Sequence, residues 1–144
     1  MPSYARPGFF VRVVAGGFIT LAVKAGFSPR GAHLLVVRGR ASGQARQVPV
    51  NPLTVDGVRY LVAPRGETQW VRNLRAAGDA RLVRGRESTA IRVVEVPDAE
   101  KPPLLREYLR RWHRETSKQF DLTERASDAE LAAAAPRHPV FRVL

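Results

Sequence analysis

RQVPVNPLTVDGVRYLVAP (residues 46–64) contains the strongest turn signal in the chain. Asp56 and Gly57 separate two apolar runs, and a type I′ turn needs positive φ at both of its central positions. The stretch therefore predicts two antiparallel strands joined by a tight turn. Pro49 and Pro52 cannot donate ladder hydrogen bonds, so we expect the first strand to lie at a sheet edge or to carry a bulge.

The flanking sequence predicts further strands and helices. Hydrophobic periodicity and turn residues place a strand at 33–40, a helix at 67–78, a hairpin at 80–97, helices at 102–115 and 127–135, and a last strand at 138–144. No repeat or linker interrupts this series. The order predicts one α+β domain built on an antiparallel sheet or small barrel.

Composition narrows the classes of function. The chain has 144 residues and no cysteine, which excludes disulfides, thiolate metal sites and cysteine nucleophiles and suits a cytoplasmic protein. Its 24 Lys and Arg against 13 Asp and Glu give a net charge of +11. Such a surface attracts polyanions, whether nucleic acid, anionic lipid or a phosphate-rich cofactor.

Residues 8–27 form the most apolar segment, but its uninterrupted run from Val13 to Val23 is 11 residues, too short for a membrane span of about 20. We expect residues 1–30 to supply an amphipathic N-terminal helix packed on a domain of residues 31–144. A helix lying at the inner face of the membrane and a cleaved signal are the alternatives.

Side-chain catalysis finds little support. His33, His113 and His138 have no metal-ligand spacing, and no G-x-S-x-G motif is present. If the protein is an enzyme, we expect a bound cofactor to carry the chemistry, with no catalytic side chain and no metal.

Two segments suggest anion binding. RGRASGQARQVPVN (38–51) combines a Gly/Ser turn with arginines, whose guanidinium groups suit phosphate or carboxylate; a solvated surface loop is the alternative. APRGETQWVRN (63–73) places Arg65 and Gly66 before a helix N-terminus capped by Thr68, where the dipole attracts anions; a cap with an incidental arginine is the alternative.

Together, GRASGQARQVPVNPL (39–53) and RYLVAPRGETQWVRNL (59–74) resemble the deazaflavin-dependent nitroreductase family. These are small split β-barrel proteins that use the reduced deazaflavin coenzyme F-420. The resemblance covers roughly residues 33–97 and extends more loosely to the N-terminal helix and to HPVFRV (138–143). It implies a split β-barrel with peripheral helices.

The resemblance also implies the site residues. The cofactor's charged tail would contact Arg40, Ala41, Ser42, Gly43 and Arg46, although many members have Lys or Arg where this chain has Ala41. The ring would lie along Gln47, Val48, Pro49, Val50 and Asn51, and the second motif would close over it with Ala63, Pro64, Arg65, Gly66, Trp70 and Asn73. Tyr108, Trp112 and Phe120 are the candidates for the substrate wall.

The activity implied is hydride transfer from reduced F-420 to a small electrophilic acceptor: a quinone, a nitroaromatic or an enone. An FMN-binding split-barrel protein and a non-catalytic F-420 carrier are the alternatives. A nucleic-acid-binding module is disfavoured because the aromatic residues fall on apolar helix faces. Peripheral membrane contact through residues 8–27 and a homodimer remain open as partner interactions.

Overall fold

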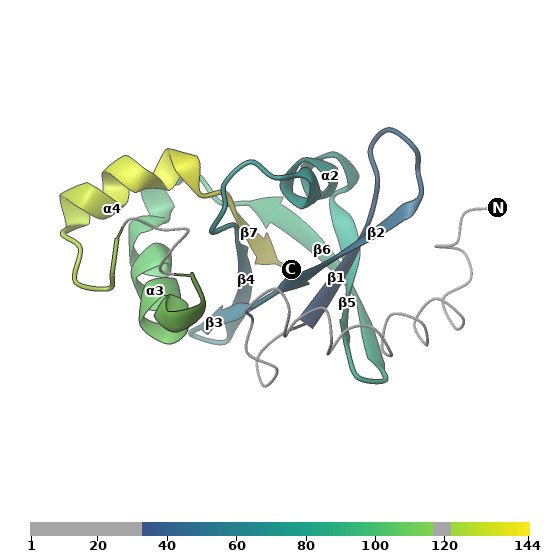
Figure 1. Cartoon of the computed structure of the whole chain (residues 1–144), viewed down its shortest axis with the longest axis horizontal. Helices are drawn as coiled ribbons and strands as arrows, with labels where there is room; N and C mark the ends of the chain where they lie inside the picture. The colour runs from purple at the N-terminus through teal and green to yellow at the C-terminus, as the bar shows by residue number, and fades with distance from the viewer. Residues whose placement is uncertain (1–32, 117–121) are drawn as a thin grey trace.

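Asn51 and Pro52 join two strands that stand at opposite edges of one sheet (Figure 1). The computed structural model describes residues 33–116 and 122–144. In it, β2 (Ala45–Val50) forms one edge and β3 (Leu53–Val55) the other. Because two residues connect these edges, the sheet must curl back on itself, and the fold is a split β-barrel.

The sheet has seven strands within the described residues, and every pairing is antiparallel. Their order is β2-β1-β5-β6-β7-β4-β3. The remaining strands are β1 (His33–Arg38), β4 (Val58–Val62), β5 (Asp79–Arg84), β6 (Glu87–Glu95) and β7 (Val140–Val143). The nine-residue β6 pairs with β5 along its first part and with β7 along its last, so it joins the two halves of the sheet.

Helices cover two parts of the sheet. Helix α2 (Gln69–Ala77) packs on β1, with smaller contacts to β2 and β5. Helices α3 (Pro102–Thr116) and α4 (Asp128–Ala134) pack together at the other end of the molecule, where α3 contacts β3 (Figure 1). Two short 3₁₀ turns, η2 (Asp98–Glu100) and η3 (Ala135–Arg137), precede α3 and follow α4.

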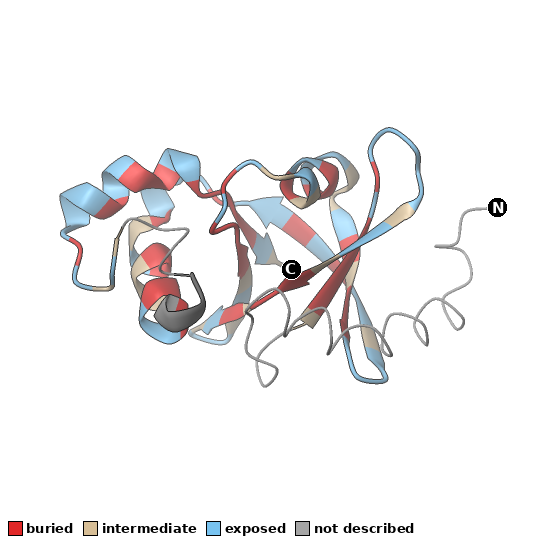
Figure 2. Ribbon diagram, viewed as in Figure 1, coloured by how far each residue is buried: buried red, intermediate tan, exposed pale blue. Residues whose placement is uncertain are grey.

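The apolar core has two parts, visible as the buried residues of Figure 2. One lies inside the barrel and includes Leu35, Leu74 and Phe141; the other lies between the sheet and α3 and includes Leu105 and Leu109. All five side chains are almost fully buried. Burial of large apolar side chains on both faces of β4 and β7 fixes the register of this half of the sheet.

Most predicted elements are confirmed, with one correction. Residues 46–64 form three strands rather than two, because the chain leaves the β2–β1 ladder at Asn51 and Pro52 and starts a new pairing with β4. The helix predicted at 127–135 ends at Ala134, and Pro136 lies in the 3₁₀ turn η3 that follows it. The predicted edge position of the proline-bearing strand is confirmed.

The N-terminal segment 1–30, with its predicted helix at 8–27, lies outside the described residues. Among the helices of residues 33–116 and 122–144, none combines the length and apolar character of a membrane span.

Substitution at Gly57 tests the hairpin that the sequence predicts. Asp56 and Gly57 have φ values of 51° and 79°, as a type I′ turn requires. Gly57→Val should lower the free energy of unfolding by roughly 1–2 kcal/mol, because a left-handed conformation is strained for a side chain with a Cβ. Urea unfolding measures the effect. Asp56→Gly is the matched control and should cause no such loss; equal stability of Gly57→Val and wild type would contradict the turn assignment.

Candidate active site

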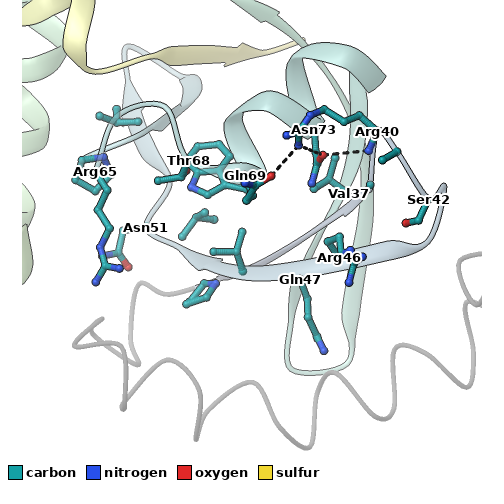
Figure 3. A pocket seen from close by; sticks show the side chains of 18 of the residues that line it. Val37, Arg40, Ser42, Arg46, Gln47, Asn51, Arg65, Thr68, Gln69 and Asn73 are labelled. Atoms are coloured by element: carbon teal, nitrogen blue, oxygen red, sulfur yellow. Dashed lines mark hydrogen bonds between the residues drawn. The ribbon is translucent and has the colours of Figure 1, made fainter.

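A cavity of about 760 Å³ opens between β2, the turn that precedes it, the loop before α2 and the first turns of α2 (Figure 3). It brings together the two segments that the sequence singled out. Its lining residues are Val37, Gly39, Arg40, Ala41, Ser42, Arg46, Gln47, Val48, Pro49, Val50, Asn51, Val62, Pro64, Arg65, Thr68, Gln69, Trp70, Asn73 and Tyr108.

Nearly all residues predicted for cofactor binding line this cavity; Gly43, Ala63 and Gly66 do not. These three shape its walls instead. Gly43 and Gly66 adopt positive φ in the two wall-forming turns, and the backbone of Ala63 is bonded to the C-terminal segment. Five lining residues were not predicted as part of a site from the sequence: Val37, Gly39, Val62, Thr68 and Gln69. Thr68 was identified only as a helix cap.

The turn between β1 and β2 is held by its own backbone. The Gly39 N–H donates to the Gln44 carbonyl (2.7 Å), and the Gly43 N–H donates to the Gly39 carbonyl (2.9 Å). The Gln44 N–H donates to the hydroxyl oxygen of Ser42 (3.2 Å). These three amides are therefore not free to bind an anion, whereas the guanidinium groups of the turn reach the cavity.

The two arginines of this turn differ in what they contact. The Arg40 guanidinium donates through Nη1 to the side-chain oxygens of Gln69 (2.9 Å) and Asn73 (2.8 Å). The exposed Arg46 guanidinium has no hydrogen bond or ion pair with any described residue. A Cβ at position 39 would lie 3.4 Å from Arg46 Nε, so the glycine at this position leaves space for the Arg46 side chain. Arg46 is therefore the cation of the turn with all its donors available to a ligand.

Asn73 fastens the turn to helix α2. Its Oδ1 accepts from the Arg40 backbone N–H (3.0 Å) as well as from the Arg40 guanidinium. The side chain is only 5% exposed, so these bonds are made largely away from solvent. Asn73 thus sets the position of the basic turn relative to the opposite wall of the cavity.

The loop before α2 is fastened to the C-terminal segment. The Ala63 N–H donates to the Pro139 carbonyl (2.9 Å), and the Ala63 carbonyl lies 3.1 Å from His138 Nδ1. A Cβ at Gly66 would lie 2.8 Å from the Arg137 carbonyl oxygen, closer than atoms can approach without displacement. These contacts position the wall that carries Pro64 and Arg65.

Burial lowers the pKa of His138 below its ordinary value of 6.5. The hydrogen bond to Ala63 opposes this shift, whereas the positive charges of Arg137 and Lys101 add to it. His138 is therefore neutral at physiological pH, with Nδ1–H available to donate to the Ala63 carbonyl. It supports the site from behind and does not line the cavity.

A three-way ion pair fixes the orientation of α2. Arg75 donates to both Glu95 carboxylate oxygens (2.7 and 2.8 Å) and to both Glu67 oxygens (2.8 and 3.1 Å). These contacts lower the pKa of Glu67 and raise that of Arg75. The groups are partly exposed, so a single pair would contribute little, but the bidentate geometry ties α2 and the preceding loop to β6.

The part of the cavity away from the basic turn is mostly apolar. Pro49, Val50 and Val62 line it, with Tyr108 from α3. Trp70 contributes a flat wall and packs against Phe141 at a ring separation of 6.2 Å. Two polar groups stand out in this part: both amide atoms of Asn51 and the hydroxyl of Thr68 are buried without a hydrogen-bond partner in the described structure.

The substrate-wall predictions have different outcomes. Tyr108 lines the cavity, whereas Trp112 is 6% exposed and packs in the core between α3 and the sheet. Phe120 lies outside the described residues. No His, Asp, Glu or Lys appears among the cavity residues, and no cluster of metal-ligating side chains occurs in the described parts of the chain.

The cavity fits a long, flat cofactor with an anionic tail. Arg46 offers an unused guanidinium at one end, and Trp70 and Pro49 offer flat apolar surfaces farther along. Asn51 and Thr68 provide unpaired polar atoms for a ring that carries carbonyl and N–H groups. Because no His, Asp, Glu or Lys lines it in the described structure, the cavity is suited to chemistry that a cofactor supplies.

Residues 17–127 match the model of the F-420H2-dependent quinone reductase family. The chain belongs to this family. Its cofactor is therefore coenzyme F-420 and its class of activity is oxidoreduction, as the resemblance of the two motifs implied. No curated protein matches the sequence significantly.

Solved structures confirm the fold of this F-420-dependent protein. One called a domain-swapped dimer has a TM-score of 0.57 and 18% identity over 99% of this chain and 98% of its own. An F-420-H2 dependent reductase, FDR-A, has a TM-score of 0.54 and 20% identity over 80% of this chain and 95% of its own.

A protein of unknown function from Agrobacterium tumefaciens str. C58 has a TM-score of 0.56 and 17% identity over 78% of this chain. The chain covers only 47% of that protein's length. At these identities the likeness establishes the split barrel and no more.

Replacing Asn73 tests how the basic turn is held. Asn73→Leu removes the oxygen that accepts two hydrogen bonds from Arg40 and should destabilise the fold by about 1–3 kcal/mol, because two partly buried donors lose their shared acceptor. Asn73→Asp keeps the acceptor and should recover most of the loss. Chemical denaturation compares the three proteins, and equal losses in both variants would show that the tether is unimportant.

Stability should depend on pH through His138. Because the folded-state pKa lies below 6.5, the unfolded state binds more protons as pH falls from about 6.5 toward the folded-state pKa, and the folded state loses stability over that window. Above this pH window, the full contribution of neutral His138 to the stability of the folded state is present. His138→Gln keeps a donor for Ala63 and removes the titration, so the melting temperature of the variant should fall less between pH 7.5 and 5. Parallel curves would contradict this assignment.

Proposed function

We propose that this F-420-dependent oxidoreductase reduces quinones, and that the residues around the cavity divide into a tail-binding end and a ring-and-acceptor end. The observation that supports this most directly is the distribution of charged and polar side chains along the cavity. Two cations, Arg40 and Arg46, lie with Ser42 at one end of the cavity in Figure 3, while Asn51, Thr68 and a single cation, Arg65, lie toward the other.

Arg46 would bind the anionic tail. Its guanidinium is unpaired in the described structure and can form two parallel hydrogen bonds to phosphate or carboxylate. Arg40 would contribute positive charge and shape, since Gln69 and Asn73 already accept from its Nη1. Ala41, in place of the Lys or Arg common in the family, leaves the turn with one cation fewer.

The strand edge would receive the ring. Val48, Pro49 and Val50 lie on β2, whose outer side has no neighbouring strand in the described sheet. Pro49 has no N–H to leave unsatisfied there, and Trp70 provides a flat surface on another wall. A planar aromatic ring can lie against this edge with little desolvation of backbone donors.

Reduced F-420, when held by the residues of the cavity, would supply the hydride that reduces an electrophilic acceptor. The protein's share is to hold the two flat molecules together and to exclude water, and orientation of this kind can be worth up to about 7–11 kcal/mol of the barrier. Tyr108, fully buried on α3, would form part of the acceptor wall.

A quinone suits this end of the cavity because it is flat, uncharged and largely apolar. Nitroaromatics and enones share these properties and are the second class of acceptor that we propose. Arg65 carries the only ionic side chain that reaches the cavity from the loop before α2, and it could stabilise negative charge that develops on an acceptor oxygen.

Turnover with reduced F-420 tests the function. Cofactor reoxidation should be followed with a quinone, a nitroaromatic and an enone in turn, with the protein omitted as the blank. We expect quinone-dependent reoxidation and no FMN binding by tryptophan quenching. Tight F-420 binding without turnover of any acceptor would indicate a carrier, and binding of FMN alone would overturn the proposal.

Arg46→Ala tests the tail-binding end. Loss of a charge-assisted hydrogen bond at an exposed site should raise the Kd for F-420 roughly tenfold and reduce its salt dependence. Arg59→Ala is the matched control, since Arg59 is exposed on β4 and does not line the cavity. Fluorescence quenching of Trp70 gives both affinities. Equal effects of the two substitutions would mean that only net charge matters.

A further inference from the structure

Among the described residues, the buried side-chain amide of Asn51 has no hydrogen-bond partner. The residue is 3% exposed, and neither its Nδ2 nor its Oδ1 has a hydrogen-bond partner in the described structure. An unsatisfied buried polar group lowers stability, and here one side chain leaves a donor and an acceptor unsatisfied together. The fold does not explain such a side chain, which points to a ligand.

Thr68 is a second such group. It occupies the N-cap of α2, where a threonine hydroxyl ordinarily accepts from the backbone of the first helical turn. Its side chain makes no capping bond, and its Oγ1 is buried without a partner. Valine has nearly the same shape as threonine but no hydroxyl, and it would fill the same space. The described structure therefore shows no contact by which the Thr68 hydroxyl stabilises the fold.

Both residues line the same cavity, away from the basic turn. In Figure 3 they lie on the side of the cavity opposite Arg46 and Ser42. Asn51 comes from the end of β2 and Thr68 from the start of α2, so they approach from different walls. Their neighbours there include the apolar Val50 and Pro64 and the cation Arg65, so the Asn51 amide and the Thr68 hydroxyl are the uncharged polar groups that a ligand would meet beside them.

We infer that the Asn51 amide, assisted by the Thr68 hydroxyl, binds the carbonyl–NH–carbonyl edge of the deazaflavin ring. A carboxamide presents one donor and one acceptor side by side, which matches a ring carbonyl next to a ring N–H. This inference rests on the proposed function. It adds that Asn51 fixes the direction of the ring in the cavity, with its imide edge toward Asn51 and its tail toward Arg46.

Ligand recognition and a structural role predict opposite effects on stability. If Asn51 serves the ligand, Asn51→Ala removes an unpaired amide from the wall of an existing cavity, so the ligand-free protein should be as stable as wild type or more so. A structural asparagine would destabilise the protein when removed. Thermal unfolding of the ligand-free proteins separates the two.

Affinity for two ligands tests the pairing. We would measure Kd by tryptophan quenching for F-420 and for the same deazaflavin ring carrying only its sugar-alcohol chain. Asn51→Ala should weaken both by about tenfold to a hundredfold, because the lost hydrogen bonds involve the ring. Thr68→Val should weaken both by a smaller factor. Arg46→Ala should weaken the binding of F-420 but not that of the ligand without the anionic tail. This variant is therefore the control that separates contacts with the ring from contacts with the tail.

A ring analogue methylated at the imide nitrogen tests the donor–acceptor match directly. Wild type should bind it more weakly than the parent ring, and Asn51→Ala should bind the two equally. If wild type binds F-420 but Asn51→Ala binds both ligands unchanged, the inference is wrong and the proposed function stands. If the wild-type protein binds no deazaflavin, the proposed function is wrong, and the inference that rests on it is wrong as well. Should Asn51→Ala not fold, equal binding of methylated and parent rings by wild type would overturn the pairing.

Discussion

The connection between β2 and β3 is the constraint on which the rest of the structure depends. Val50 ends a strand at one edge of the sheet, and Leu53 begins a strand at the other. Two intervening residues force the edges together and curl the sheet. The same connection places Asn51 in the wall of the cavity, next to a strand, β2, whose outer side has no neighbouring strand in the described sheet. The same short connection therefore both closes the barrel and forms part of the cavity wall.

The walls of the cavity are positioned by contacts between distant parts of the chain. Asn73 holds the basic turn against α2, and His138 holds the loop before α2 against the C-terminal segment. Arg75 joins α2 to β6. Because each wall has its own anchor, the cavity is preformed, and less binding energy is spent on ordering the protein around a ligand. Stability and function are linked here through positioning residues that need not touch the ligand.

Local patterns allowed much of the fold to be predicted. The Asp56-Gly57 turn appears where it is predicted, because it depends on neighbours within a few residues. The same is true of the helices predicted at 67–78 and 127–135, which have local end signals: Gly78 caps the end of α2, and Ser127 and Glu130 form a capping box at the start of α4. The break at Asn51 and Pro52 was not predicted, since the choice between one bent strand and two strands depends on partners far along the chain. Family motifs, not periodicity, indicated most of the cavity lining.

The other features that were not predicted from the sequence depend on long-range contacts or on a choice between equivalent positions on one helix. Arg40 and Asn73 are far apart in sequence, and no local pattern shows that one asparagine oxygen serves both Arg40 donors. Tyr108 and Trp112 lie on the same apolar face of α3, yet only Tyr108 lines the cavity, because periodicity identifies a face and not the end of the helix that meets the site.

A crystal structure of the protein with F-420 would test the central claim most directly, namely that the cavity has a tail end and a ring end. The account predicts the phosphate-bearing tail beside Arg46 and the ring along Val48–Asn51, with its imide edge within hydrogen-bonding distance of the Asn51 amide. A cofactor bound in the reverse direction, with its tail at Arg65 and its ring at the β1–β2 turn, or bound outside the cavity, would contradict it.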